Sequence, residues 1–223
     1  MNCQSLNEET GNYITINYLH PGLDLLCFTE TWSQEGSGSY APFPGFTIIA
    51  EFCRNQHRGG GVAIWGKYGY DMEPINLQRY CDEKHFEICG LRWKLEARNP
   101  VCILVCYRSP DGDLHIFCNR LFEVLNHVYH PGFTMYVMGD FNVDPVRDYR
   151  EYFTLCNILQ TFYLDNIVKQ PPRGIYTIDH IFTNNVSNDH ECFSIKNHTP
   201  DHNTVIATVA ARQMRQVRRR LTA

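Results

Sequence analysis

Residues 133–142 constrain the fold of this chain more than any other stretch. The first six are apolar apart from one threonine, which indicates a buried strand, and a glycine then leads into Asp140, Phe141 and Asn142. Because side chains alternate across a strand, Phe141 should enter the core while Asp140 and Asn142 face the other side. An Asx turn at a strand end would look the same, so a functional interpretation depends on the rest of the chain.

Many strands and few helices are expected. The strands are predicted at 23–29, 46–52, 62–65, 86–93, 101–107, 133–140, 175–182, 193–196 and 204–210, with a short edge strand within 66–85. The helices are predicted at 12–20, 114–129 and 147–160. Strands do not alternate regularly with helices, which excludes a Rossmann fold or an alternating barrel. An α/β (α+β) arrangement of two mixed β-sheets packed face to face, with outer helices, accommodates the pattern.

The chain of 223 residues fits one domain at 1–211, followed by a basic tail at 212–223. It has no apolar run long enough for a membrane helix and no signal sequence, so we expect an intracellular protein, nuclear or cytoplasmic. Several of the ten cysteines lie in apolar strand-like runs and no Cys-x-x-Cys pair occurs. We interpret them as reduced core residues, which argues against zinc.

The formal net charge of −4 is distributed unevenly. The tail holds five of the 20 basic residues and no acid, so the rest carries 15 basic against 24 acidic residues. An acidic body that handles a polyanion needs a divalent cation at the contact point. The tail itself fits either a nucleic-acid or nuclear-import patch or a solvated terminus.

Polar side chains collect where the predicted strands end. They are Asn2, Glu30, Tyr107, Asp140, Asn142, Asp179, Asp201 and His202. Four carboxylates without a Cys or His cluster suit Mg²⁺ or Mn²⁺. One imidazole suits acid–base work, and two amides and a phenol can donate to phosphate oxygens. The set is typical of metal-assisted phosphodiester hydrolysis.

Asp179 lies in an apolar strand, where an unpaired carboxylate would be costly, and His202 is a suitable partner. His180 points the opposite way along that strand and is interpreted as a core or rim histidine. The three glycines at 59–61 lack a following Lys-Ser/Thr, so we interpret them as the start of a strand rather than a phosphate cradle.

Seven motifs occur along the chain in this order: NCQSL (2–6), LCFTETW (26–32), RGGGVAI (58–64), YRSP (107–110), GDFN (139–142), IDHIFTN (178–184) and PDH (200–202). Together they resemble the ordered motifs of the endonuclease/exonuclease/phosphatase superfamily. TETW and RGGGVAI favour the apurinic-endonuclease-like domain of non-LTR (LINE-type) retrotransposons. The resemblance covers essentially the whole chain and implies the four-layered sandwich of DNase I-like proteins.

The resemblance also implies roles at the metal. Glu30 would be the principal metal ligand, with Asn2 and Asp201 in the metal or water shell. Asp140 would orient or deprotonate the attacking water. Whether Asp140 or the pair of His202 and Asp179 takes the proton stays open.

At the substrate, the resemblance implies that Asn142 holds the scissile phosphate and that Tyr107 braces it. Arg108 would contribute to substrate binding, and His202 would contact the phosphate or act as base. Two positions depart from the pattern: no strand precedes Asn2, so a truncated N-terminal strand is expected, and Pro200 stands where a serine commonly precedes Asp-His.

The expected activity is that of a Mg²⁺-dependent (or Mn²⁺-dependent) DNA endonuclease that nicks one strand and leaves a 3′-hydroxyl, as in target-site cleavage by a retrotransposon. The expected partners are DNA and a downstream reverse transcriptase in a longer polyprotein, with no membrane and a monomeric isolated domain. Two alternatives stay open: a metal-dependent phosphodiesterase or phosphatase acting on a small phosphoester or lipid, and an inactive relic that serves as a binding module.

Overall fold

The computed structural model describes residues 1–34, 43–95, 99–168, 177–185, 190–196 and 203–209. The helices are α1 (Glu8–Asn17), α2 (Leu114–Val128) and α3 (Tyr149–Gln160), with a 3-10 helix η1 (Gln78–Tyr80). The strands are β1 (Leu25–Thr29), β2 (Phe46–Phe52), β3 (Val62–Lys67), β4 (Met72–Pro74), β5 (Glu87–Trp93), β6 (Val101–Tyr107), β7 (Thr134–Asp140), β8 (Asp165–Asn166), β9 (Asp179–Thr183), β10 (His190–Lys196) and β11 (Asn203–Val209).

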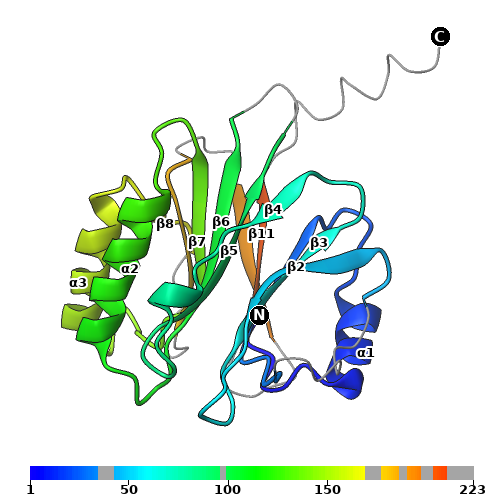
Figure 1. Cartoon of the computed structure of the whole chain (residues 1–223), viewed down its shortest axis with the longest axis horizontal. Helices are drawn as coiled ribbons and strands as arrows, with labels where there is room; N and C mark the ends of the chain where they lie inside the picture. Colours follow the sequence, from blue (N-terminus) through cyan, green and yellow to red (C-terminus); the bar gives the residue numbers. More distant parts are fainter. Residues whose placement is uncertain (35–42, 96–98, 169–176, 186–189, 197–202, 210–223) are drawn as a thin grey trace.

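These elements form two facing sheets with helices outside. A six-stranded sheet has the order β4-β5-β6-β7-β9-β8 and a three-stranded sheet the order β1-β3-β2. Figure 1 shows α2 and α3 on the outer face of the larger sheet and α1 on the outer face of the smaller one. The predicted four-layered sandwich is therefore confirmed.

Alternation along each strand separates the core into layers. In β6, Cys102 and Leu104 pack toward α2 and α3, whereas Ile103 and Val105 pack toward the smaller sheet. A third cluster, which includes Phe28 of β1, packs beneath α1. Because β5, β6, β7 and β9 contribute apolar side chains to both faces of the larger sheet, their sequences are nearly continuous in hydrophobicity.

The unit β6–α2–β7 brings two strand ends together. β6 and β7 pair in parallel, with Tyr107 opposite Asp140. Asp113 caps α2 by accepting hydrogen bonds from two backbone N–H groups of its first turn. Gly139 has a φ of 138°, and a Cβ there would overlap the carbonyl oxygen of Cys106 on the neighbouring strand. Glycine at this position therefore permits the close approach of β6 and β7.

Most predicted elements occur with bounds shifted by a few residues, and two differences are larger. The first helix begins at Glu8 rather than at residue 12, because Asn7 caps it by accepting a 2.9 Å hydrogen bond from the Thr10 N–H. The weak amphipathic pattern at 12–20 obscured this start. The two-residue strand β8 was also missed, since so short a segment has no periodicity of its own.

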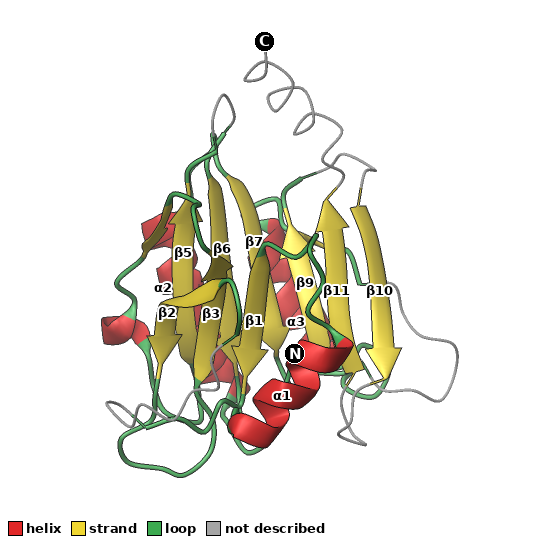
Figure 2. Ribbon diagram, turned by 90° about the vertical axis from the view of Figure 1, so that its right-hand side faces the viewer, coloured by secondary structure: helices red, strands yellow, loops and turns green. Residues whose placement is uncertain are grey.

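The hairpin β10–β11 stands next to β9 at the edge of the sandwich away from β2 (Figure 2). Cys192, Val205 and Ala207 of this hairpin pack against the core between the sheets. In the described part of the chain, no helix has the length and apolar character needed to cross a bilayer.

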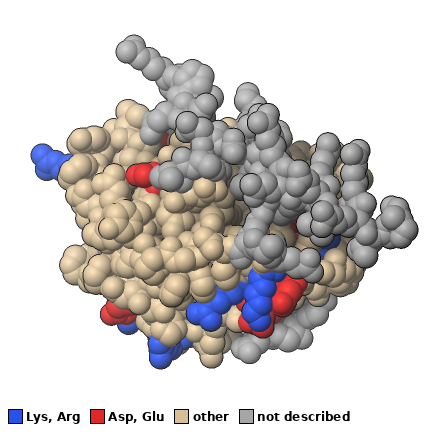
Figure 3. All heavy atoms as spheres, turned by 90° about the horizontal axis from the view of Figure 1, so that it is seen from above, with Lys and Arg blue, Asp and Glu red and all other residues tan. Residues whose placement is uncertain are grey.

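In Figure 2, β1 points toward the lower end of the molecule and β9 points upward. Because β7 runs antiparallel to β9, β7 also ends at the lower end, as β1 does. Figure 3 views the molecule from the opposite end. Its described surface is mostly uncharged, and most of the lysine and arginine side chains lie along one edge together with aspartate and glutamate side chains. The polar strand ends therefore face away from this largely neutral end.

Candidate active site

Asn2 joins the two sheets at the site. Residues 1–6 run alongside β1, where Asn2 forms a parallel bridge with Thr29. The fully buried Asn2 side chain donates from Nδ2 to Glu30 Oε1 at 2.6 Å and to Asp140 Oδ2 at 2.9 Å. Its Oδ1 accepts from the backbone N–H of Gln4 at 3.2 Å. One neutral amide therefore holds a carboxylate from each sheet.

Glu30 follows β1 with a φ of 53°, a left-handed conformation that is uncommon for a non-glycine residue. Its second oxygen, Oε2, accepts a hydrogen bond from Trp32 Nε1 at 3.1 Å. Both carboxylate oxygens are thus oriented by neutral donors. Strain at such a position is tolerated where surrounding contacts fix it, as they do here.

Asp140 ends β7 and is fully buried. Its Oδ1 accepts from the Asn142 N–H at 3.0 Å, which closes an Asx turn. The Asn142 side chain donates to the Arg108 carbonyl at 2.6 Å. Phe141 between them is fully buried, and its ring contacts Phe117 in α2, as alternation predicted.

Asp179 begins β9 directly opposite Asp140, so a third carboxyl-bearing residue joins the same sheet edge. Asp201 and His202 lie outside the described residues. The pairing of Asp179 with His202 and the placement of Asp201 at the metal therefore stay predictions.

The end of β6 contributes Tyr107 and Arg108. Burial raises the pKa of Tyr107 well above its usual value, and the nearby Glu30 carboxylate adds to the rise, so the phenol stays a proton donor. The Arg108 guanidinium donates to the carbonyls of Phe141 at 2.9 Å and Asn142 at 2.8 Å, and also to the Gly112 carbonyl. Arg108 therefore fixes the turn that carries Asn142, while its direct contact with substrate stays a prediction.

A buried ion pair next to the site was not identified from the sequence. Arg54 Nε donates to Glu87 Oε1 at 2.5 Å, and both side chains are buried. Arg54 Nη2 also donates to Ser109 Oγ at 2.6 Å, and Ser109 hydrogen-bonds Tyr107. The carboxylate of Glu87 inside an apolar strand was the available signal, because the same argument singled out Asp179.

The glycines at 59–61 make room for this ion pair. A Cβ on Gly60 would collide with the Arg54 guanidinium, and one on Gly61 would lie 2.5 Å from Thr31 Oγ1. The Gly61 N–H donates to Glu87 Oε2 at 2.6 Å. These contacts agree with the interpretation of the glycines as the start of β3.

Two further groups brace the loop after Asn142. Asp144 accepts from the N–H groups of Val146, Arg147 and Thr177, which lower its pKa against the opposing effect of burial. His180, 1% exposed, meets the Val143 carbonyl through Nε2 at 2.9 Å. Burial lowers the pKa of His180, so it is a neutral core histidine, as predicted.

The donor set fits a hard divalent cation. Glu30 and Asp140 converge on one neutral amide, and a cation would relieve the repulsion between two such carboxylates. Within the described residues no group of three Cys, His, Asp or Glu side chains could hold a metal by itself, so further oxygen ligands are needed.

Cys3 is the cysteine beside Glu30. Burial raises its pKa to about 12, so it is a protonated thiol. All ten cysteines are free, as expected.

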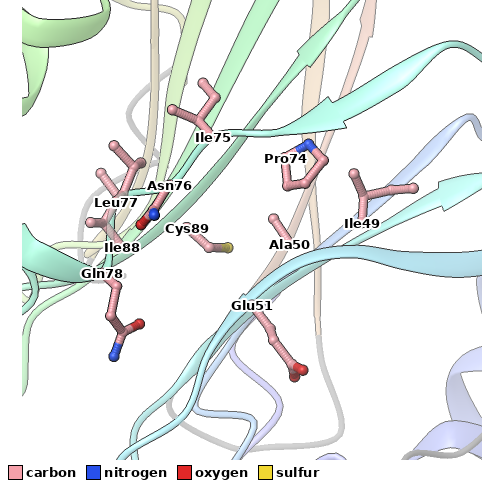
Figure 4. A pocket seen from close by; sticks show the side chains of 10 residues that line it. All are labelled: Ile49, Ala50, Glu51, Pro74, Ile75, Asn76, Leu77, Gln78, Ile88 and Cys89. Atoms are coloured by element: carbon pink, nitrogen blue, oxygen red, sulfur yellow. The ribbon is translucent and has the colours of Figure 1, made fainter.

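A separate pocket lies between β2 and the β4–β5 edge (Figure 4). Most of the residues that line it are apolar, and Glu51, Asn76 and Gln78 are its polar side chains. None of the strand-end residues lines it, so it is not part of the candidate site.

Residues 1–192 match the model of the Endonuclease/Exonuclease/phosphatase family. No curated protein matches the chain significantly. The endonuclease domain of TRAS1, a telomere-specific non-LTR retrotransposon, is a similar solved structure, with 14% identity, a TM-score of 0.72, and 94% of this chain and 95% of that chain covered.

Two other solved structures are also similar. The 3′ phosphatase NExo from Neisseria, bound to a product DNA hairpin, has 15% identity and a TM-score of 0.60, with 94% of this chain and 97% of that chain covered. An AP endonuclease from Archaeoglobus fulgidus has 14% identity and a TM-score of 0.57, with coverages of 92% and 96%. At these identities the likeness establishes the fold.

Proposed function

Because the chain belongs to the endonuclease/exonuclease/phosphatase family, whose members hydrolyse phosphoester bonds, we propose that it is a Mg²⁺-dependent DNA endonuclease that nicks one strand and leaves a 3′-hydroxyl. The observation that carries the proposal is the Asn2 amide, which fixes Glu30 and Asp140 from opposite sheets at one point. The fold shared with the TRAS1 endonuclease domain supports DNA as the substrate.

Glu30 and Asn2, together with Asp201, would hold the cation. When bound, Mg²⁺ neutralises charge on the phosphate and lowers the pKa of attacking water. Asn2 and Trp32 donate to the two oxygens of Glu30, so its carboxylate is already oriented for the cation before substrate binds.

The other residues act on the phosphate and the water. Asp140 keeps its oxygens aimed at the site through Asn2 and the Asn142 N–H, and there it orients or deprotonates the attacking water. Asn142 uses one amide N–H on the Arg108 carbonyl, which leaves its second N–H for a phosphate oxygen. Tyr107 retains its proton and donates to the same phosphate. His202 with Asp179 is the alternative base.

The test is relaxation of supercoiled plasmid by the purified chain with Mg²⁺. Asp140→Asn should lower the nicking rate by about 10²-fold or more, the usual contribution of acid–base catalysis. Asp111→Asn is the matched control, because Asp111 has a side chain that is 67% exposed and lies in a surface ion pair with Lys84. It should nick at the wild-type rate. Wild-type relaxation no faster than that of Asp140→Asn would contradict the proposal, and faster hydrolysis of small phosphoesters would favour the alternative substrate class.

A further inference from the structure

Trp32 is exposed next to the candidate metal ligand. Of the three tryptophans, Trp65 and Trp93 are buried, whereas Trp32 is 48% exposed. It lies two residues after Glu30 and has a left-handed φ of 53°. A large indole ring held outside the core at a polar site forgoes the stabilisation of burial, which is typical of a contact surface.

The ring is held in place from one side. Its Nε1–H donates to Glu30 Oε2 at 3.1 Å, and its backbone N–H donates to the Gly60 carbonyl at 2.8 Å. The ring also lies over Gly59, where an added Cβ would be 3.4 Å from Nε1 and 3.8 Å from two ring carbons. The indole therefore packs against the loop at Gly59, while about half of the residue stays exposed.

A rigid aromatic surface beside a phosphodiester-cleaving site suits a flat aromatic group attached to the phosphate. We propose that Trp32 is a stacking platform for the nucleobase adjoining the scissile phosphate, and that its N–H at the same time positions Glu30. This proposal rests on the proposed nuclease function and names how that site holds its substrate. A ring held by a hydrogen bond from Nε1 and by packing on Gly59 loses little conformational freedom when a base stacks on it.

Stacking and positioning are separable by substitution. Trp32→Leu removes both the ring and the donor, whereas Trp32→Phe keeps an aromatic ring and removes only the donor to Glu30. Tyr68→Leu is the matched control, because Tyr68 is another exposed aromatic residue, 66% exposed, on the turn after β3.

Binding is measured by fluorescence anisotropy with a labelled DNA oligonucleotide in EDTA, which prevents hydrolysis. A series of oligonucleotides carries one abasic position each. Trp32→Leu should weaken binding by about 5- to 150-fold, the range for loss of base–aromatic stacking. The wild-type chain should lose a similar factor at one abasic position, and Trp32→Leu should lose nothing further there. Trp32→Phe should bind nearly as wild type but need more Mg²⁺ for half-maximal nicking.

Affinity of Trp32→Leu equal to that of Tyr68→Leu, or an abasic penalty that persists in Trp32→Leu, would overturn the stacking platform. An unchanged Mg²⁺ requirement in Trp32→Phe would overturn the positioning role. Failure of the nuclease function would look different. In that case neither the wild-type chain nor any variant would nick plasmid, while DNA binding would still depend on Trp32.

Discussion

Neutralising Glu87 should destabilise the fold strongly, because the Arg54–Glu87 ion pair is buried between the sheets. Glu87 is fully buried and accepts from Arg54 Nε at 2.5 Å, from the Gly61 N–H at 2.6 Å and from the Lys84 N–H at 2.9 Å. In Glu87→Gln, the Arg54 guanidinium keeps its charge in a site without a counter-ion. Removal of one partner of a buried pair costs about 3–5 kcal/mol.

Arg54→Met tests the other half of the pair. Burial raises the pKa of Glu87, and Arg54 opposes that rise. Without Arg54 the folded-state pKa of Glu87 rises further above its unfolded value, so the folded state binds the proton more tightly. The loss of stability in Arg54→Met should therefore be largest at alkaline pH and should diminish as the pH falls toward that pKa.

The double variant Arg54→Met/Glu87→Gln removes both charges, and the Gln oxygen can still accept one backbone N–H. We expect its loss of stability to be smaller than the sum of the single losses by about 2 kcal/mol or more. Urea unfolding at pH 7 measures the three values, and each kcal/mol corresponds to about 2–4 °C in Tm for a domain of this size. Additivity within about 0.5 kcal/mol would refute the coupling.

Three further predictions concern other parts of the chain. Gly139→Ala should lower the free energy of unfolding by about 3 kcal/mol or more, because the φ of 138° and the Cys106 carbonyl leave no room for a Cβ. At Gly45 a Cβ has open space, so Gly45→Ala should lose only about 1–2 kcal/mol from backbone strain, and thermal unfolding compares the two variants. Burial lowers the pKa of His180, so the unfolded chain takes up the proton first, and the free energy of unfolding should fall as the pH drops below about 6.5. His180→Gln should reduce this loss between pH 7.5 and 5.5 in urea titrations, and an equal loss in both proteins would contradict the assignment. Deletion of 212–223 should weaken DNA binding at low salt and reduce the log–log salt slope by about 0.9 for each phosphate that the tail neutralises, and an unchanged slope would show that the tail does not lie along DNA.

Local patterns determined most of the fold and part of the site. The predicted bounds of β2 and β6 agree with the structure, because apolar runs flanked by polar turns report burial directly. Alternation placed Phe141 in the core and Asp140 at the strand end, and the seven ordered motifs predicted the family that the match over residues 1–192 confirms. Strand periodicity and motif order are properties of neighbouring residues, so a sequence displays them.

Tertiary structure decided which distant groups meet. The resemblance placed Asn2 near Glu30, but nothing near Asn2 in the chain indicates that its amide also holds Asp140, 138 residues away. Arg54 and Glu87, 33 residues apart, looked unrelated until β2 and β5 faced each other. A buried polar group needs a hydrogen-bond partner, and the sequence can show which residues have that need. Which residue becomes the partner depends on how the two sheets stack.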